Sequence, residues 1–323
     1  METNEKLPLR HLGKTDILVT PIGLGVMEMA GGGGLIGRMF PVISQEDKNA
    51  IIKAALDGGI NWFDTAEMYG AGVSERSLAT GLKAAGKTDK DVIVATKWQP
   101  IFRTARNIPI SIEDRLRFLD GFSIANYMVH QPYSFSSPEA EMNAMADLVE
   151  AGKIRSVGVS NFNPARMRRA HAALAKRGLP LAVNQVQYSL LRRDIETNGV
   201  LETARELGVT ITAYTPLARG LLSGKYHKNP ELLRRMSGVR KAMMRRNLER
   251  SRPLINAMDE LAAKYGITIA QVALNWVINF NGETVVTIPG ATKVRQAEES
   301  AGAMKFKLSK DEMARLDEVS RKL

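Results

Sequence analysis

The chain contains no cysteine, and this absence excludes a whole group of chemistries. Disulfide bonds, thiolate nucleophiles and cysteine-ligated metals all require that side chain. Histidine is nearly as scarce: His11, His130, His171 and His227 are scattered along 323 residues and form no H-x-x-x-H pair. We therefore expect a protein that binds no catalytic or structural metal.

Long apolar runs are also missing. No stretch of 18 or more apolar residues occurs, so we expect no membrane-spanning helix and no membrane partner. The opening METNEKLPLR lacks the apolar core of a signal peptide, which predicts a cytoplasmic protein. No linker or low-complexity tract interrupts the chain, which predicts one domain over residues 1–323. The lack of an obvious exposed apolar stripe favours a monomer.

Acidic residues are outnumbered by basic ones, and the formal net charge is +11. The excess gathers in residues 234–252, RRMSGVRKAMMRRNLERSR. Three interpretations of this segment are open: a solvated loop and helix face, a loop that holds phosphate, or a nucleic-acid surface. The segment has no aromatic residue, whereas a platform for stacking single-stranded bases requires them. We therefore expect no nucleic-acid partner.

What the chain does contain is a regular alternation of β-branched apolar runs with helical patterns. The helical patterns open near Ser or Asn and close on Gly, as in the stretch from Ser44 to Gly58. Eight strands are predicted, at residues 22–26, 60–65, 92–96, 123–129, 154–159, 182–187, 209–214 and 284–288. Eight strands alternating with helices predict an α/β fold, a closed parallel (β/α)8 TIM barrel.

Three additions to the barrel are predicted. Residues 7–20, LPLRHLGKTDILVT, indicate an N-terminal β-hairpin that covers the closed end of the barrel. A long loop is expected after the seventh strand, beyond residue 216, and an extra C-terminal helix around residues 309–320.

Residues 30–38, AGGGGLIGR, spell the G-x-G-x-x-G dinucleotide fingerprint, with Asp57 about twenty residues further on. They also nearly spell a P-loop, but Arg38 and Met39 stand where Lys and Ser/Thr are required. The fingerprint works only at a direct turn from strand to helix. Here the strand ends near Val26, the next helix waits until Ser44, and the acidic residue closes that helix. We interpret the glycines as a flexible loop at the substrate mouth.

Reactive side chains gather where the predicted strands end, which is where TIM barrels carry their active sites. Asp64 ends the second strand with Tyr69 just beyond it, Lys97 ends the third, and His130 ends the fourth. A phenol is too weak an acid for efficient catalysis near neutral pH. We expect the Lys97 ammonium to lower the pKa of Tyr69 and Asp64 to hold that lysine. Such a proton donor to a carbonyl oxygen requires a hydride source on the other side of the carbonyl.

At this point the sequence resembles the aldo-keto reductase family. The resemblance rests on seven segments in order: RHLGKTDILVTPIGLG, DTAEMYG…SERSL, ATKW, GKIRSVGVSNF, NQVQYSLLRR, AYTPLARGLLSGKY and IPGATKVRQAEES. It implies a (β/α)8 barrel that uses NAD(P)H without a Rossmann fold. It also implies a catalytic tetrad of Asp64, Tyr69, Lys97 and His130, in which Tyr69 is the acid.

The resemblance further implies where the cofactor lies. Nicotinamide would be held by residues of strands five to seven, pyrophosphate by the loop from Thr215 to Lys225, and adenosine by residues 290–300. Lys293 and Arg295 favour a 2′-phosphate, and therefore NADP(H) over NAD(H). The implied cofactor contacts are Gly25, Val26, Met27, Asp64, Ser160, Asn161, Gln185, Tyr214, Thr215, Pro216, Leu217, Arg219, Gly220, Leu222, Lys225, Gly290, Thr292, Lys293, Gln296, Glu299 and Ser300.

The substrate pocket is expected to be walled by Met27, Glu28, Met68 and Trp98, together with residues 99–110 and the basic loop after Arg219. This largely apolar lining suits a small aromatic or aliphatic carbonyl compound. The chain departs from the family pattern at Val26-Met27, where Thr-Trp or Thr-Tyr is common, at Ala125, where many relatives are acidic, and at Ser300, where Asn is usual.

The function implied is an NADPH-dependent oxidoreductase of the alcohol dehydrogenase and carbonyl reductase class, which reduces aldehydes or ketones to alcohols. The alternative is a cofactor-binding, redox-sensing regulatory subunit with little turnover, because some members of the superfamily serve potassium channels in that role.

Overall fold

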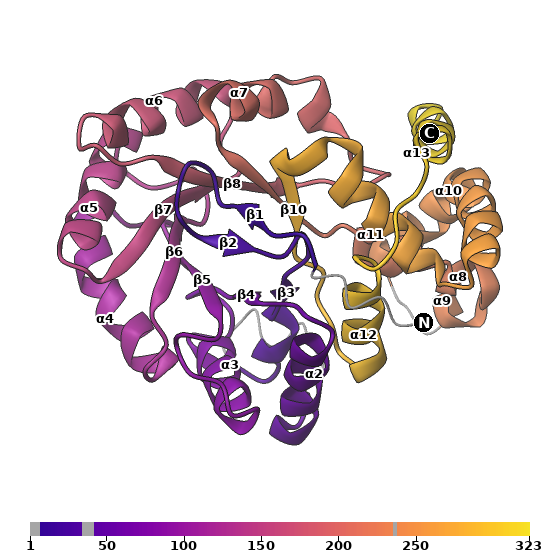
Figure 1. Ribbon diagram of the computed structural model, residues 1–323, viewed down its shortest axis with the longest axis horizontal. Coiled ribbons are helices and arrows are strands. Elements are labelled where there is room, and N and C mark those ends of the chain that lie inside the picture. Colours follow the sequence, from indigo (N-terminus) through magenta and orange to yellow (C-terminus); the bar gives the residue numbers. More distant parts are fainter. Residues whose placement is uncertain (1–6, 34–41, 235–237) are drawn as a thin grey trace.

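The computed structural model describes residues 7–33, 42–234 and 238–323 (Figure 1). Its centre is a parallel sheet in which the strands pair in chain order. Those strands are β3 (Leu24–Gly25), β4 (Trp62–Asp64), β5 (Ile93–Trp98), β6 (Ile124–Val129), β7 (Ile154–Ser160), β8 (Leu181–Gln187), β9 (Thr210–Tyr214) and β10 (Val285–Thr287). Each lies within two residues of its predicted position.

The sheet closes on itself between its first and last strands. The backbone N–H of Gly23 donates to Thr287 at 2.8 Å, and that of Gly25 donates to Pro289 at 3.0 Å. Parallel bridges join Ile22 to Thr287 and Gly25 to Gly290. The predicted (β/α)8 barrel is therefore confirmed.

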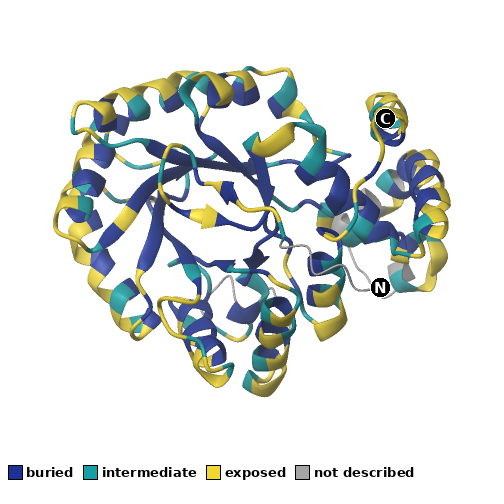
Figure 2. Cartoon of the chain, in the orientation of Figure 1, coloured by how far each residue is buried: buried dark blue, intermediate teal, exposed yellow. Residues whose placement is uncertain are grey.

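Helices surround the barrel and are buried on the side that faces the strands (Figure 2). The α-helices of this layer are α2 (Gln45–Asp57), α3 (Val73–Ala84), α4 (Ile108–Leu119), α5 (Pro138–Glu150), α6 (Pro164–Ala175), α7 (Val200–Leu207), α11 (Ile269–Phe280) and α12 (Val294–Gly302). Short 3-10 turns are η1 (Met27–Ala30), η2 (Ala105–Asn107), η3 (Asp194–Glu196), η4 (Ala218–Ser223) and η5 (Gly282–Thr284). Ser44, Ser137 and Asn163 cap α2, α5 and α6 through their side chains.

The N-terminal hairpin is β1 (Arg10–His11) with β2 (Leu18–Val19), and it lies across the barrel in Figure 1. Leu12, Ile17 and Val19 pack into the barrel interior as one buried cluster with side chains of the strands. The Arg10 guanidinium donates to the Val285 carbonyl at the start of β10 at 2.5 Å. The predicted cover over the closed end is confirmed, and it leaves the opposite rim as the open one.

The segment after β9 corrects the expected long loop. It folds as η4, α8 (Lys225–Lys228), α9 (Glu231–Arg234) and the long helix α10 (Gly238–Tyr265). Apolar residues recur at helical spacing in its second half, and Leu254, Met258 and Leu261 are buried there. That period specifies a helix, so α10 takes the place of much of the long loop that the sequence predicts after residue 216.

The helix α7 begins at Val200, directly after Gly199, which adopts φ 83°. The predicted C-terminal helix is confirmed as α13 (Lys310–Arg321), capped by Ser309. Within the described ranges, no single helix is long and apolar enough to cross a membrane. A bent pair, Asn247–Tyr265 with Ile269–Phe280, meets that test by length and composition only.

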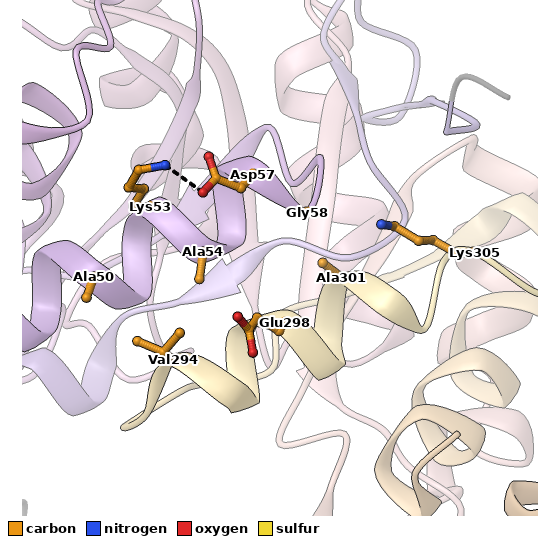
Figure 3. A pocket seen from close by; sticks show the side chains of 9 residues that line it. All are labelled: Ala50, Lys53, Ala54, Asp57, Gly58, Val294, Glu298, Ala301 and Lys305. Atoms are coloured by element: carbon orange, nitrogen blue, oxygen red, sulfur yellow. Dashed lines mark hydrogen bonds and ion pairs between the residues drawn. The ribbon is translucent and has the colours of Figure 1, made fainter. Parts of the chain in front are cut away.

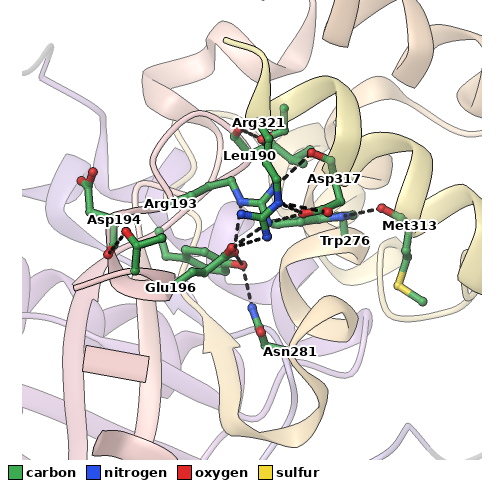
Figure 4. Close-up of polar contacts among 12 residues, drawn as sticks. Leu190, Arg193, Asp194, Glu196, Trp276, Asn281, Met313, Asp317 and Arg321 are labelled. Carbon is green, nitrogen blue, oxygen red and sulfur yellow. Dashed lines mark hydrogen bonds and ion pairs between the residues drawn. The ribbon is translucent and has the colours of Figure 1, made fainter. Parts of the chain in front are cut away.

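An arginine-centred cluster fastens α13 to the barrel (Figure 4). The Arg193 guanidinium lies 4.9 Å from the ring centroid of Trp276 on α11. It forms ion pairs with Glu196, at 2.7 Å, and with Asp317 on α13. Glu196 also accepts from the Tyr188 hydroxyl at 2.6 Å. This one side chain therefore bridges three segments that are far apart in the sequence.

Replacing Arg193 with methionine is expected to lower the free energy of unfolding by about 2–3 kcal/mol, because the largely buried Glu196 would keep only the half-exposed Arg321 as its cation. Urea denaturation measures the change. The matched control is Lys322→Met, since Lys322 and Glu318 are exposed by 70% and 68% and such pairs contribute little. Equal effects of the two substitutions would contradict the role of the cluster.

Candidate functional site

The open rim brings the four predicted catalytic side chains together. Asp64 ends β4 and Lys97 lies near the end of β5, so adjacent strands place the two side chains side by side. The Lys97 Nζ lies 2.5 Å from Asp64 Oδ1, and the two side chains are 0% and 2% exposed. Lys97 also donates to the Thr65 carbonyl at 2.8 Å, and Gln185 donates to the other Asp64 oxygen at 2.9 Å. The result is a water-excluded ion pair in which both groups have further partners.

Tyr69 and His130 lie over this ion pair. The Lys97 Nζ lies 5.1 Å from the ring centroid of Tyr69, and the Tyr69 and His130 rings meet edge to face with centroids 5.6 Å apart. Among the described residues the Tyr69 hydroxyl has no hydrogen-bond partner, and the buried Nδ1 of His130 has none either. Because this phenol hydroxyl lies beside an imidazole and has no such partner, it is available to hydrogen-bond an oxygen atom of a bound molecule.

The electrostatics correct the expected pKa of Tyr69. Burial, followed by the negative charges of Asp64 and Glu28, raises the pKa of Tyr69 above its usual value, where a decrease was predicted. The positive charge of Lys97 is already balanced by Asp64, and so it does not outweigh the loss of water around the phenol. Burial and the nearby Lys97 charge lower the pKa of His130. At neutral pH the site therefore holds a protonated phenol and a neutral imidazole.

The predicted nicotinamide residues form one connected set. Asn161, with φ 60°, accepts a hydrogen bond from the Tyr214 hydroxyl at 3.0 Å. The Asn161 amide donates to Ser160 at 3.0 Å, and the Ser160 hydroxyl donates to the Gln185 carbonyl at 2.9 Å. Because Gln185 also contacts Asp64, the ends of β7, β8 and β9 are tied to the ion pair.

The loop after β9 has an unusual backbone. Thr215, Ala218, Arg219 and Gly220 have φ values of 55°, 47°, 57° and 85°. The N–H groups of Ala218 and Gly220 donate to the Thr215 and Leu217 carbonyls at 3.0 and 2.9 Å, so this backbone forms consecutive tight turns. Lys225 lies over it, because a Cβ on Gly220 would be 2.9 Å from the Lys225 Nζ. Leu222 and Pro216 are buried, and the Leu222 N–H donates to the Leu217 carbonyl at 3.2 Å.

At the start of α12, backbone N–H groups and charged side chains that the sequence assigns to the cofactor already have partners within the protein. The Gln296 side-chain oxygen accepts from the backbone N–H of Thr292 at 2.7 Å and of Lys293 at 3.2 Å, which caps the helix. The Ser300 hydroxyl donates to the Gln296 carbonyl at 2.8 Å, and Arg295 pairs with Glu299 at 2.7 Å. Lys293 is exposed at this helix start.

A sequence model of the Aldo/keto reductase family matches residues 21–321. The chain belongs to this family. It is 33% identical over 97% of its length to a chloroplastic pyridoxal reductase from Arabidopsis thaliana, of which 87% is covered.

Solved aldo-keto reductases share the fold. A glycerol dehydrogenase from Gluconobacter oxydans superimposes with a TM-score of 0.80 at 26% identity, covering 96% of this chain and 94% of that one. An aldo/keto reductase from Klebsiella pneumoniae, solved with NADP and acetate, gives a TM-score of 0.73 at 26% identity with the same coverage.

The predicted substrate wall of this aldo-keto reductase needs one correction. Met27, Glu28 and Met68 are partly exposed at the rim. Trp98 has no exposed surface: it belongs to the core between the barrel and its helices, and its indole N–H donates to Asn107 at 3.0 Å. Neighbouring residues of a strand point to opposite faces, so Lys97 faces the barrel interior and Trp98 faces the helices.

The residues after the first strand pack against the ends of the second and last strands. Val26 is buried, and its N–H donates to the Asp64 carbonyl at 2.9 Å. The Glu28 carboxylate packs directly against Gly290, because a Cβ there would lie 2.3 Å from Oε2. Burial raises the pKa of Glu28 to about 7. Any larger residue at position 290 would therefore collide with this carboxylate.

The described part of the glycine-rich stretch, which ends at Gly33, is not part of the predicted active site. Gly32 turns the chain after η1 with φ 84°, while residues 34–41, including Gly34, Gly37, Arg38 and Met39, lie outside the described residues. Asp57 ends α2 and pairs with Lys53 at 2.6 Å. It lines a groove of about 410 Å³ between α2 and α12 that contains none of the tetrad (Figure 3). The structure therefore gives Asp57 no role in a dinucleotide fingerprint.

Two further side chains contact the site and were not singled out from the sequence. Gln131 follows His130 and accepts from the Asn161 amide at 3.2 Å. Glu67 lies in the DTAEMYG segment and accepts from Gln99 and Arg103, at 2.8 and 2.7 Å, in the loop after β5. Both lie within two residues of predicted catalytic residues in the sequence, but only the fold shows what they contact.

Proposed function

We propose that this aldo-keto reductase is an NADPH-dependent enzyme that reduces aldehydes or ketones to alcohols, with Tyr69 as the general acid. The observation that carries the proposal is the Tyr69 hydroxyl, which has no partner among the described residues, beside the buried Lys97–Asp64 pair and a neutral His130. Proton donation to a developing alkoxide needs this arrangement: a neutral acid, with a cation close enough to stabilise the phenolate that remains.

The residues of the rim fit a dinucleotide. The charges of Arg219 and Lys225 in the turns after β9 suit a pyrophosphate, and the Tyr214 hydroxyl is held by Asn161 among the predicted nicotinamide residues. NADPH, when bound, supplies the hydride. The Klebsiella pneumoniae relative was solved with NADP, which supports the same choice here.

Side chains of the protein donate the proton and stabilise the charge that its transfer leaves behind. Tyr69 donates its proton to the carbonyl oxygen as negative charge develops there, and Lys97 stabilises the resulting phenolate across the short gap to the ring. Asp64 keeps Lys97 charged within a dry site. His130, being neutral, is able to hydrogen-bond the same oxygen and orient it.

A panel of aldehydes and ketones tests this function, with the decrease in NADPH absorbance as the readout. Turnover that saturates with substrate and requires NADPH is the expected result. Tight NADPH binding without turnover of any carbonyl compound would instead support the regulatory-subunit alternative.

Cofactor preference is expected to depend on Lys293. Its exposed ammonium at the start of α12 is placed for a 2′-phosphate, whereas Arg295 is already paired with Glu299. Lys293→Ala should weaken NADPH binding by about tenfold and leave NADH binding unchanged, which is the usual size of one charge-assisted contact. Intrinsic-fluorescence titration with both cofactors measures this. Lys310→Ala, at the exposed start of α13, is the matched control and should alter neither. Equal weakening of NADPH and NADH would contradict a role in phosphate recognition.

A further inference from the structure

A buried network of ion pairs contacts the segment that carries Tyr69. Its centre is Arg115 on α4, which is 3% exposed. The guanidinium lies 3.3 Å from a Glu67 oxygen and 2.9 Å from a Glu75 oxygen, and these two carboxylates are 14% and 0% exposed. Glu67 stands two residues before Tyr69, and Glu75 stands six residues after it, in the first turn of α3. One cation therefore contacts the chain on both sides of the proposed acid.

Each carboxylate of this network also contacts the strand β5, which carries Lys97. Glu75 accepts a hydrogen bond from the Thr96 hydroxyl at 2.8 Å, and Thr96 directly precedes Lys97 on β5. Glu67 accepts from the backbone N–H of Gln99, just after the strand, at 2.8 Å, and its own N–H donates to the Lys97 carbonyl at 3.2 Å. The network thus joins the segment after β4 to β5 by two separate routes.

The backbone between the two carboxylates turns sharply. Gly70, Ala71 and Gly72 adopt φ values of 71°, 53° and 89°, all in the left-handed region. A residue with a Cβ, such as Ala71, is strained there and keeps that conformation only where its surroundings enforce it. Phe118 of α4 packs on this turn, because a Cβ on Gly72 would lie 2.4 Å from its ring, and the Arg115 guanidinium lies 5.2 Å from the centroid of the same ring. The loop that presents the phenol therefore depends on contacts that α4 supplies.

We propose that Arg115 is a positioning residue, which holds Tyr69 in a fixed place beside Lys97 through its two ion pairs. This inference rests on the function proposed above. A misplacement of about 1 Å in a catalytic group can lower the rate by about a hundredfold. A buried ion pair adds little stability compared with a well-packed apolar side chain, so stability alone does not explain a buried arginine at this point of α4. A planar guanidinium with its fork of donors, by contrast, is able to orient two carboxylates at once.

Steady-state reduction of benzaldehyde by NADPH tests the positioning role. Arg115→Met should lower kcat by about thirtyfold to a hundredfold, because the phenol is no longer held beside the lysine. The dissociation constant of NADPH should stay within about twofold, since the partners of Arg115 lie in the segments that carry the acid and the lysine. Arg115→Lys keeps the charge but loses the planar fork, so its kcat should be intermediate, about tenfold below that of the wild type.

Arg117→Met is the matched control. Arg117 lies on the same helix, and its guanidinium lies 5.0 Å from the centroid of the same Phe118 ring. It is 69% exposed and pairs with Asp114 of its own helix at 2.7 Å. Its kcat should stay within about twofold of the wild type, because it does not hold the segment of Tyr69. Equal losses of kcat in Arg115→Met and Arg117→Met would overturn the proposal.

Hydrogen exchange of backbone amides tests the same role without turnover. The N–H of Glu67 is bonded to β5, and that of Tyr69 donates to the Ala66 carbonyl at 3.0 Å. In Arg115→Met, peptides that cover residues 65–75 should exchange about tenfold faster than in the wild type, because this segment opens more often. Peptides of β7 and β8 should keep their exchange rates, and Arg117→Met should change neither.

The two measurements keep the proposals separable. If the wild-type protein reduces no carbonyl compound, the proposed function fails, and hydrogen exchange alone decides the positioning role. In an active protein both kcat and the local exchange must change, and a wild-type value of either would overturn the role. Faster exchange over the whole barrel, or NADPH binding that weakens in step with kcat, would overturn it too, because Arg115 would then serve the fold in general. Arg115→Lys supplies both measurements if Arg115→Met does not fold.

Discussion

Tyr69→Phe is expected to lower kcat for carbonyl reduction by about a thousandfold, within the range that general acid catalysis contributes. The substitution removes one oxygen and keeps the ring that packs against His130 and Lys97. The Tyr69 hydroxyl has no partner among the described residues, so its loss should leave the fold and NADPH binding nearly unchanged. NADPH absorbance gives kcat, and a fluorescence titration gives the dissociation constant of the cofactor.

Tyr133→Phe is the matched control for this experiment. It deletes the same atom from a tyrosine on the same rim, and Tyr133 is 64% exposed. Its kcat should stay within about twofold of the wild type, since an exposed hydroxyl outside the tetrad is not required for proton transfer. Full activity of Tyr69→Phe, or an equal loss in the two variants, would contradict the assignment of the acid.

Lys97→Met is expected to lower the free energy of unfolding by about 3–5 kcal/mol and to abolish most activity. It leaves Asp64, which is 2% exposed, without its cation in a site that excludes water. The phenolate of Tyr69 would also lose its stabilising charge. Urea denaturation measures the stability and NADPH absorbance measures the turnover.

A double substitution separates stability from catalysis. Asp64→Asn combined with Lys97→Met removes both buried charges, so most of the lost stability should return. Activity should not return, because no cation remains near Tyr69. Recovery of activity in the double variant would show that the ion pair serves only the fold. A Lys97→Met protein as stable as the wild type would contradict the burial cost.

Most of the fold was predictable because its signals are local. The strands follow β-branched apolar runs, and Ser44, Ser137 and Asn163 stand directly before the helices they cap. The segment after β9 is largely helical where a long loop is predicted, because Leu254, Met258 and Leu261 recur at helical spacing and are buried on one face of α10.

By itself, the sequence determined the barrel and the identity of the rim residues, because strand ends in a closed parallel barrel meet at one rim. Asp64, Tyr69, Lys97 and His130 were identifiable on that ground and by resemblance. Only the tertiary structure decided the protonation state of Tyr69, the position of Trp98 and the burial of Arg115. A pKa and an exposed fraction depend on which atoms from distant segments replace water around a group. That arrangement is set by three-dimensional packing and is not encoded in the spacing of neighbouring residues.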